Sequence, residues 1–231
     1  MSVKNEFSKY AKEYQSHNII QQICAKSLVR ELKNKPKKIL ELGCGSGQVF
    51  SQITWDIDFY KAIDFSESMC ELHPKGKNIQ VKCHDFDTQE FLDEIANDNY
   101  DIILSSSALQ WSKDLTKIVK HLSYITDEIN AVLFTSNTFK TIQEVSCTKS
   151  PILDEKSIKN AFSKYFECEF ETIMYKLEFD NKKDLFDYIK KSGVSGGNST
   201  LDFKAAKKLY KDYNLNYLEF EVIFIKTVSK L

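Results

Sequence analysis

Short apolar runs alternate with amphipathic stretches along the first 140 residues of the chain. Runs of five or six apolar residues that stop at glycine or a polar residue are typical of buried parallel strands. Apolar positions three and four residues apart are typical of helices that bury one face. This pattern predicts strands at residues 38–43, 59–64, 79–83, 100–105 and 131–135. It predicts helices at residues 17–32, from near Gly47, and at 66–72, 88–96 and 115–124.

The pattern changes beyond residue 150. Asp154 is suited to cap a helix that runs to about Tyr165. Two long runs, at residues 168–179 and 216–228, alternate polar residues with Phe, Tyr, Ile and Val, as antiparallel strands do. Between them, helices are predicted at 182–191 and 203–213, joined by a glycine- and serine-rich loop at 192–200.

These elements predict an α/β protein of Rossmann-like fold. Strands that alternate with helices form βαβ units, so the sheet should be mostly parallel with helices on both faces. The two late runs bring the number of predicted strands to seven and should form an antiparallel far edge near the C-terminus.

Composition narrows the class of protein. A chain of 231 residues with 42% hydrophobic residues can bury the core of one large domain. The six cysteines are scattered, without a C-x-x-C pair or a histidine at ligand spacing, so no metal site is predicted. No apolar run reaches the roughly 18 residues that a membrane span needs, which predicts a cytoplasmic protein without a membrane partner.

Charge is unevenly distributed along the chain. Residues 1–36 and 181–231 each carry a net charge of +4, whereas residues 37–180 carry −9. The basic ends could be solvated lysine faces or surfaces that attract an acidic partner, and no nucleic-acid partner is predicted. Arg30 is the only arginine, so at most one position can grip a substrate carboxylate with a guanidinium group.

The segment E-L-G-C-G-S-G at residues 41–47 carries the clearest chemistry. Closely spaced glycines after a strand let the backbone turn sharply and approach a ligand, with amides presented at the start of a helix. A nucleotide-bearing cofactor of this kind needs an acidic residue about twenty positions later, at the end of the next strand. Asp64 stands there. A dinucleotide site would need glycine at position 48, which is Gln48.

The motif resembles the first motif of class I S-adenosylmethionine-dependent methyltransferases, and the resemblance extends over the first 140 residues. It implies that S-adenosyl-L-methionine is the cofactor and that the glycine turn faces its methionine portion. It also implies that the carboxylate after the second strand binds the ribose hydroxyls, next to Phe65. The residues that match are Glu41, Gly43, Gly45, Gly47 and Asp64.

Two further segments fit the same resemblance. After the third strand, Asp85 and Phe86 occupy positions where the family places a carboxylate on the adenine amino group and an apolar side chain against the ring. After the fourth strand, Ser105 is a further candidate for contact with the cofactor. An aspartate after a strand is also a common turn residue, and it is the succession of acids at one edge of the sheet that favours a ligand site.

Four local features resemble the malonyl-[acyl-carrier protein] O-methyltransferases of biotin synthesis. They are F-S-K-Y-A-x-x-Y at residues 7–14 followed by Gln21 and Gln22, S-S-S-A-L-Q-W at 105–111, L-F-T-S at 133–136, and L-F-D-Y-I-K-K-S-G-V at 185–194. The first resembles a segment that forms a helical lid over the cofactor. Residues 143–149 depart from the family pattern, because they lack its glutamate–leucine pair and the arginine that follows.

This resemblance implies a carboxyl O-methyltransferase whose partner is malonyl-acyl carrier protein, a strongly acidic substrate. A carboxylate is already ionised at pH 7 and needs no general base, so catalysis would come from alignment and desolvation. Tyr14 and Trp111 are candidate walls of the acceptor pocket, and for each a buried core aromatic is the alternative interpretation.

Other functions stay open at this point. They are methylation of another small carboxylate such as trans-aconitate, binding of S-adenosylmethionine without catalysis, and, more remotely, a dehydrogenase. The expected layout is a single methyltransferase domain over residues 1–231. It comprises an N-terminal lid and helix at 1–36, a cofactor-binding core at 37–140, and acceptor-side helices and edge strands at 141–231.

Overall fold

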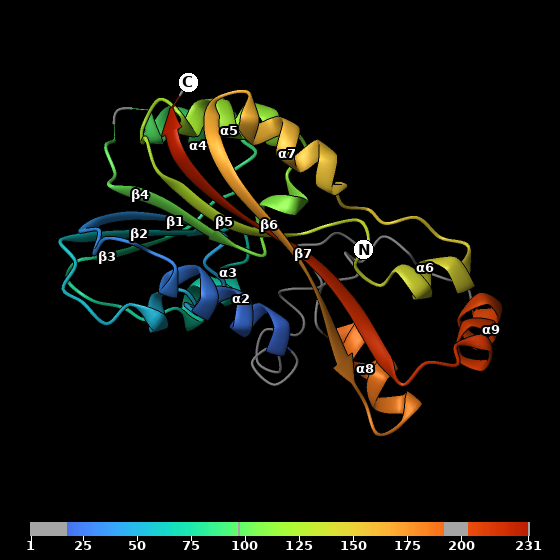
Figure 1. Cartoon of the computed structure of the whole chain (residues 1–231). Coiled ribbons are helices and arrows are strands. Elements are labelled where there is room, and N and C mark those ends of the chain that lie inside the picture. Colours follow the sequence, from blue (N-terminus) through green and yellow to red (C-terminus); the bar gives the residue numbers. More distant parts are fainter. Residues whose placement is uncertain (1–17, 97, 192–202, 231) are drawn as a thin grey trace.

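A seven-stranded mixed sheet forms the centre of the computed structural model, which describes residues 18–96, 98–191 and 203–230 (Figure 1). The strand order is β3-β2-β1-β4-β5-β7-β6. Strands β1 to β5 are parallel, whereas β7 pairs antiparallel with both β5 and β6. The strands are β1 Lys38–Leu42, β2 Phe59–Asp64, β3 Ile79–Cys83, β4 Ile102–Ser106, β5 Ile129–Phe134, β6 Phe166–Glu178 and β7 Tyr217–Lys230. The predicted Rossmann-like sheet with antiparallel strands at its far edge is confirmed.

Successive residues of β1 face opposite sides of the sheet and so build two separate cores. Ile39 belongs to one apolar cluster, whereas Leu40 and Leu42 belong to the other. Helices α4 (Gln89–Ile95), α5 (Leu115–Leu122) and α7 (Glu155–Ser163) contribute to the cluster of Leu40, above the sheet in Figure 1. Below it, α2 (Ile19–Arg30) packs on the cluster of Ile39, and α3 (Glu67–Leu72) lies on the same side.

Strand β1 lies at the point where the order of the sheet reverses. Its neighbours are β2 on one side and β4 on the other, so the connections that leave β1 and β4 run away from each other. In open α/β sheets, ligands bind in the crevice outside the carboxyl ends of the strands at such a switch point. The fold therefore places a crevice beside the residues that follow Leu42 and Ser106.

The long ribbon of β6 and β7 carries the last helices. Its pairing runs from Phe166 with Lys230 to Glu178 with Tyr217, with an irregularity between Glu167 and Cys168. The ribbon projects beyond the parallel strands (Figure 1). At that end lie α8 (Lys182–Lys191) and α9 (Phe203–Asp212), and α6 (Lys140–Ser146) contacts α9.

The structure differs from the predicted elements at two places. The helix expected from near Gly47 is wrong: that segment is a turn followed by a short 3-10 helix, η2, at Phe50–Gln52. Gly47 itself has φ of 90°, which excludes it from an α-helix, and the residues after it form only the short 3-10 turn. Helix α6 was not predicted, and it is bounded by Phe139 and Cys147, both in left-handed conformations. The cap expected at Asp154 is confirmed, because its side chain accepts a hydrogen bond from the Ser157 amide.

Some predictions fall outside the described residues. These are the lid segment at residues 1–17, with Tyr14 in it, and the loop at 192–200. Within the part of the chain that is described, no helix is long and apolar enough to cross a membrane.

Candidate active site

Three glycines with positive φ shape the turn that follows β1. The φ angles are 75° at Gly43, 50° at Gly45 and 90° at Gly47. The amide of Gly43 donates to the Ile63 carbonyl at 2.8 Å and so ties the turn to β2. A β-carbon on Gly43 would lie 2.0 Å from the β-carbon of Ala108, so only glycine lets the segment after β4 pack here.

Gly47 and Gly45 have different surroundings. A β-carbon at Gly47 would lie 2.5 Å from Pro74 and 3.2 Å from the buried ring of His73. At Gly45, in contrast, nothing lies within 4 Å of the position that a β-carbon would take. Gly43 and Gly47 are therefore needed for packing within the protein, whereas Gly45 borders open space that a ligand can fill.

Asp64 joins the end of β2 to this turn. Its Oδ2 accepts a hydrogen bond from the Gly45 amide and its Oδ1 accepts one from the Ser66 amide, both at 2.9 Å. Burial raises the pKa of Asp64 to about 6, although the two amides act in the opposite direction. Both oxygens are thus held in fixed positions at the edge of the crevice.

Glu41 is a second buried carboxylate, with 1% of its surface exposed. It accepts a hydrogen bond from the hydroxyl of Tyr60 on β2, and it forms no ion pair with any described residue. Burial raises the pKa of Glu41 to about 8; the bond from Tyr60 lowers it and the charge of Asp64 adds to the rise. A cation bound in the crevice would therefore stabilise the ionised form of Glu41.

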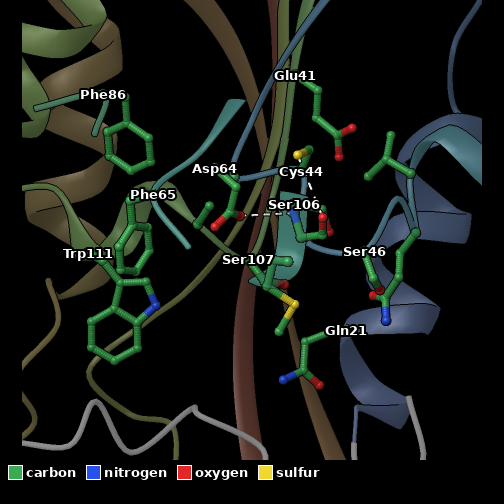
Figure 2. A pocket seen from close by; sticks show the side chains of 16 residues that line it. Gln21, Glu41, Cys44, Ser46, Asp64, Phe65, Phe86, Ser106, Ser107 and Trp111 are labelled. Atoms are coloured by element: carbon green, nitrogen blue, oxygen red, sulfur yellow. Dashed lines mark hydrogen bonds between the residues drawn. The ribbon is translucent and has the colours of Figure 1, made fainter. Parts of the chain in front are cut away.

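The crevice is a pocket of about 610 Å³ (Figure 2). Aromatic side chains of Phe65, Phe86 and Trp111 lie along one side of it, with Asp64 between them and Glu41. The other lining residues are Gln21, Gly43, Cys44, Gly45, Ser46, Gln48, Val49, Met69, Ser106, Ser107 and Ala108. The pocket thus combines a flat apolar wall with acids and small polar groups.

Three buried polar atoms in this lining have no hydrogen-bond partner among the described residues. They are the hydroxyls of Ser106 and Ser107 and the amide nitrogen of Gln48. Ser107 also has φ of 59°, which is uncommon for a residue other than glycine. That conformation is held by its own amide, which donates to the Val132 carbonyl, and by Gln110, which donates to its carbonyl. Unpaired polar groups and backbone strain at one pocket are typical of a ligand site.

A family profile described as a methyltransferase domain matches residues 14–165 of the chain. The chain belongs to the methyltransferase-domain family. This methyltransferase uses S-adenosylmethionine as its methyl donor.

Curated relatives give a finer comparison. The methyltransferase is 26% identical over 242 residues to the malonyl-[acyl-carrier protein] O-methyltransferase of Bacillus anthracis, covering 90% of this chain and 88% of the relative. It is 26% identical over 211 residues to the enzyme of the same name from Haemophilus influenzae, covering 85% and 78%.

Solved structures share the fold at low sequence identity. The YcgJ protein of Bacillus subtilis superposes with a TM-score of 0.67 at 11% identity, over 90% of this chain and 99% of that one. The magnesium protoporphyrin IX methyltransferase of Synechocystis, solved with bound SAH, has a TM-score of 0.55 at 13% identity, over 90% and 83%. These likenesses support the Rossmann-like methyltransferase fold.

The pocket of this methyltransferase fits such a donor. S-adenosylmethionine carries a flat purine, a ribose with two hydroxyls, and a positively charged methionine portion. The aromatic wall, the fixed oxygens of Asp64 and the buried Glu41 each offer a matching surface. The unpaired Ser106, Ser107 and Gln48 groups supply polar partners that the protein itself leaves unused.

Most residues expected to contact the donor line this one pocket. They are Glu41, Gly43, Gly45, Asp64, Phe65 and Phe86, together with Trp111 from the acceptor prediction. Trp111 is half-buried and also packs against the core cluster of Ile39.

Three expected residues have other surroundings. Ser105 is fully buried and its hydroxyl donates to the Leu42 carbonyl at 2.9 Å, which ties β4 to β1. Asp85 is half-buried, its Oδ1 accepts a bond from the Asp87 amide, and it does not line the pocket. Gly47 packs against Pro74 and His73 and does not line the pocket either.

Several lining residues were not predicted as contacts, notably Gln21, Gln48, Met69, Ser106 and Ser107. Ser106 and Ser107 lie in the S-S-S-A-L-Q-W run. The run alone does not tell which of its three serines line the pocket, because Ser107 has an unusual left-handed backbone conformation. Met69 comes from helix α3, and no local motif marks it. Gln21 comes from α2 and belongs to the first segment that resembles the biotin-synthesis family, although it was not predicted as a donor contact. Among the described residues, no cluster of His, Cys, Asp and Glu could hold a metal ion.

Proposed function

We propose that this methyltransferase is a carboxyl O-methyltransferase that methylates the free carboxylate of a malonyl thioester on acyl carrier protein. The observation that carries the proposal is the similarity to curated enzymes of that activity along nearly the whole chain.

The chemistry of the pocket supports an acidic acceptor. No histidine or lysine is found among the described residues that line it, and its two carboxylates, Asp64 and Glu41, are assigned to the donor in this proposal. A carboxylate acceptor needs no general base, because it is ionised and nucleophilic at neutral pH. Alignment and exclusion of water can then supply most of the rate, and proximity effects reach about 7–11 kcal/mol.

Within this proposal, each part of the pocket has a role in donor binding. The bound donor supplies a methyl group on a sulfonium, which is open to attack by the acceptor oxygen. Asp64 binds the ribose hydroxyls, Phe65 and Phe86 hold the adenine ring, and Glu41 faces the cationic methionine portion. Asp85 would reach the adenine amino group only with the oxygen that is not bonded to the Asp87 amide.

The acceptor side is assigned by position. Trp111 lies at the end of the aromatic wall and would separate the donor from the acceptor, with Tyr14 of the lid as its proposed counterpart. Residues 141–231 would form the acceptor side, residues 37–140 the donor-binding core, and residues 1–36 the lid and first helix.

Mass spectrometry of malonyl-acyl carrier protein, incubated with the enzyme and S-adenosylmethionine, tests the proposal. We expect the malonyl group on the carrier to gain one methyl group. Methylation of free trans-aconitate, with no methylation of the thioester, would replace the proposal by a small-acid methyltransferase. Tight donor binding with neither product would identify a non-catalytic binding protein. An Asp64→Ala variant is the control for background methylation.

A further inference from the structure

Helix α9 presents four lysines on one face. Lys204, Lys207, Lys208 and Lys211 follow the spacing i, i+3, i+4 and i+7, so they project from one side of the helix. All four are exposed, and none forms an ion pair with a described residue. We call these four residues the lysine face. Like charges at this spacing repel one another by a few tenths of a kcal/mol per pair, so the arrangement does not stabilise the helix itself.

The opposite side of α9 fixes the helix to the protein. Leu209 is 5% exposed and belongs to the core cluster of Ile39. The ring of Tyr210 lies 5.1 Å from that of Phe186 on α8. The ammonium group of Lys182 donates to the Tyr210 carbonyl at 3.1 Å. Tyr210 lies near the C-terminal end of α9, where a positive charge stabilises a helix. The lysine face is therefore held in place rather than carried on a loose segment.

A cavity with both apolar and polar lining residues adjoins this helix, and its polar lining includes Gln143, Ser146 and Lys149. Ile142 of α6, Phe186 and Ile189 of α8, and Ala206 and Leu209 of α9 line it. Thr138 and Phe139 line it as well and follow β5, whose neighbour β4 ends at the donor pocket. The cavity therefore lies on the side of α9 opposite the lysine face, at the same edge of the sheet as the donor and one strand further along.

We propose that the lysine face of α9 is the docking surface for an acidic carrier protein that brings its thioester-bound acyl group to the carboxyl edge of the sheet. The inference rests on the proposed function, which supplies a protein-bound carboxylate as substrate. Four unpaired positive charges over a helix about 15 Å long match the acidic surface of a small protein.

Nucleic acid is the competing polyanion, and the charge of the rest of the chain disfavours it. Residues 37–180 carry a net charge of −9, so a long polyanion that extended beyond α9 would meet a repulsive surface. A small acidic protein confined to the helix would avoid that region.

The double variant Lys204→Glu/Lys208→Glu tests the docking surface in steady-state methylation assays. For malonyl-acyl carrier protein we expect KM to rise by about tenfold or more with kcat nearly unchanged, because docking charges act on encounter and affinity. For malonyl-coenzyme A, a thioester without a protein, KM should change by less than about twofold. The wild-type KM for the carrier substrate should also rise with salt, and that of the variant should rise less.

The matched control is Lys117→Glu/Lys120→Glu. These two lysines are exposed on α5, which lies at the opposite end of the molecule from α9 (Figure 1). The control should leave both KM values unchanged. An equal rise in KM for the two thioesters, an equal effect of the control pair, or no effect of the α9 pair would overturn the docking surface.

Failure of the docking surface can be told apart from failure of the proposed function. If the wild-type enzyme methylates malonyl-coenzyme A and the carrier substrate but the α9 variant behaves like wild type, only the docking surface is wrong. If the wild type methylates neither, the proposed function is wrong. Calorimetric titration with the carrier protein and with a DNA duplex then tests the docking surface. Charge-dependent binding of the carrier supports it, and binding of DNA alone contradicts it.

Discussion

Asp64 and Glu41 lie at the carboxyl ends of adjacent strands, but their surroundings give them different charges. Both oxygens of Asp64 accept hydrogen bonds from backbone amides, and its pKa of about 6 keeps it mostly ionised at neutral pH. Glu41 has one hydroxyl as its partner, and a pKa of about 8 leaves it mostly protonated before a cation binds. The pocket therefore holds one permanent anion, Asp64, and one carboxyl group, Glu41, that ionises when a cation binds beside it.

Asp64→Ala should weaken the binding of S-adenosylmethionine by about 1–3 kcal/mol, because charge-assisted hydrogen bonds to two ribose hydroxyls are lost. Isothermal titration calorimetry measures the effect directly. Asp64→Asn, which keeps one oxygen for the Gly45 amide, should lie between Ala and wild type. Equal affinity for all three proteins would remove Asp64 from the donor site.

Glu41→Gln should alter how stability depends on pH in the ligand-free protein. An acid whose pKa is raised by folding binds its proton more tightly in the folded state, so stability falls as pH rises from about 4.5 to about 8. The loss is at most about 1.4 kcal/mol for each pH unit in that window. Glutamine stays neutral, so the variant should be as stable as wild type near pH 4 and more stable near pH 9.

Urea denaturation across that pH range checks this prediction. Glu71→Gln, which removes a carboxylate from an exposed position on α3, is the matched control and should leave the profile of wild type unchanged. Parallel profiles for wild type and Glu41→Gln would show that Glu41 is not held protonated by its surroundings.

Among the elements of the fold, the strands were the most predictable. The runs at residues 59–64 and 79–83 coincide with β2 and β3. β2 is a buried central strand, whereas β3 at the edge of the sheet alternates apolar and polar residues, and both patterns are typical of strands. The α-helix predicted from near Gly47 is wrong, because hydrophobic spacing does not reveal that Gly47 has a positive φ and packs on Pro74 and His73. Contacts between distant segments, such as Ala108 on Gly43, likewise have no local signal.

Gly43→Ala tests the contact between the glycine turn and the segment after β4. Its new methyl group would lie 2.0 Å from the Ala108 β-carbon, and a left-handed φ adds strain. We expect a loss of about 2–5 kcal/mol in stability from overpacking and strain together, with loss of donor binding.

Gly45→Ala is the matched variant, because it has the same kind of strain but no clash. It should lose only about 1–2 kcal/mol of stability, as expected for one residue in that conformation. It should nevertheless bind the donor more weakly, since its methyl group would enter the pocket. Thermal unfolding with and without S-adenosylmethionine separates the two effects, and equal melting temperatures for the two variants would contradict the packing argument.

For the whole molecule, the sheet order brings together segments that are far apart in the sequence. The reversal at β1 sets the turn at 43–47, the end of β2 and the segment after β4 around one pocket. The sequence motifs predicted most of that pocket because they mark the ends of strands, where parallel topology gathers them. They could not predict the contribution of Met69, which depends on how α3 packs below the sheet.

The most direct test of the account is a crystal structure of this methyltransferase with S-adenosylhomocysteine, the product left by the donor. The account predicts the ribose on Asp64, the adenine ring against Phe65 and Phe86, and the methionine portion beside Glu41 and the glycine turn. Ser106 or Ser107 should then acquire a hydrogen-bond partner. A nucleoside bound elsewhere, or bound with Asp64 still facing only the Gly45 and Ser66 amides, would contradict it.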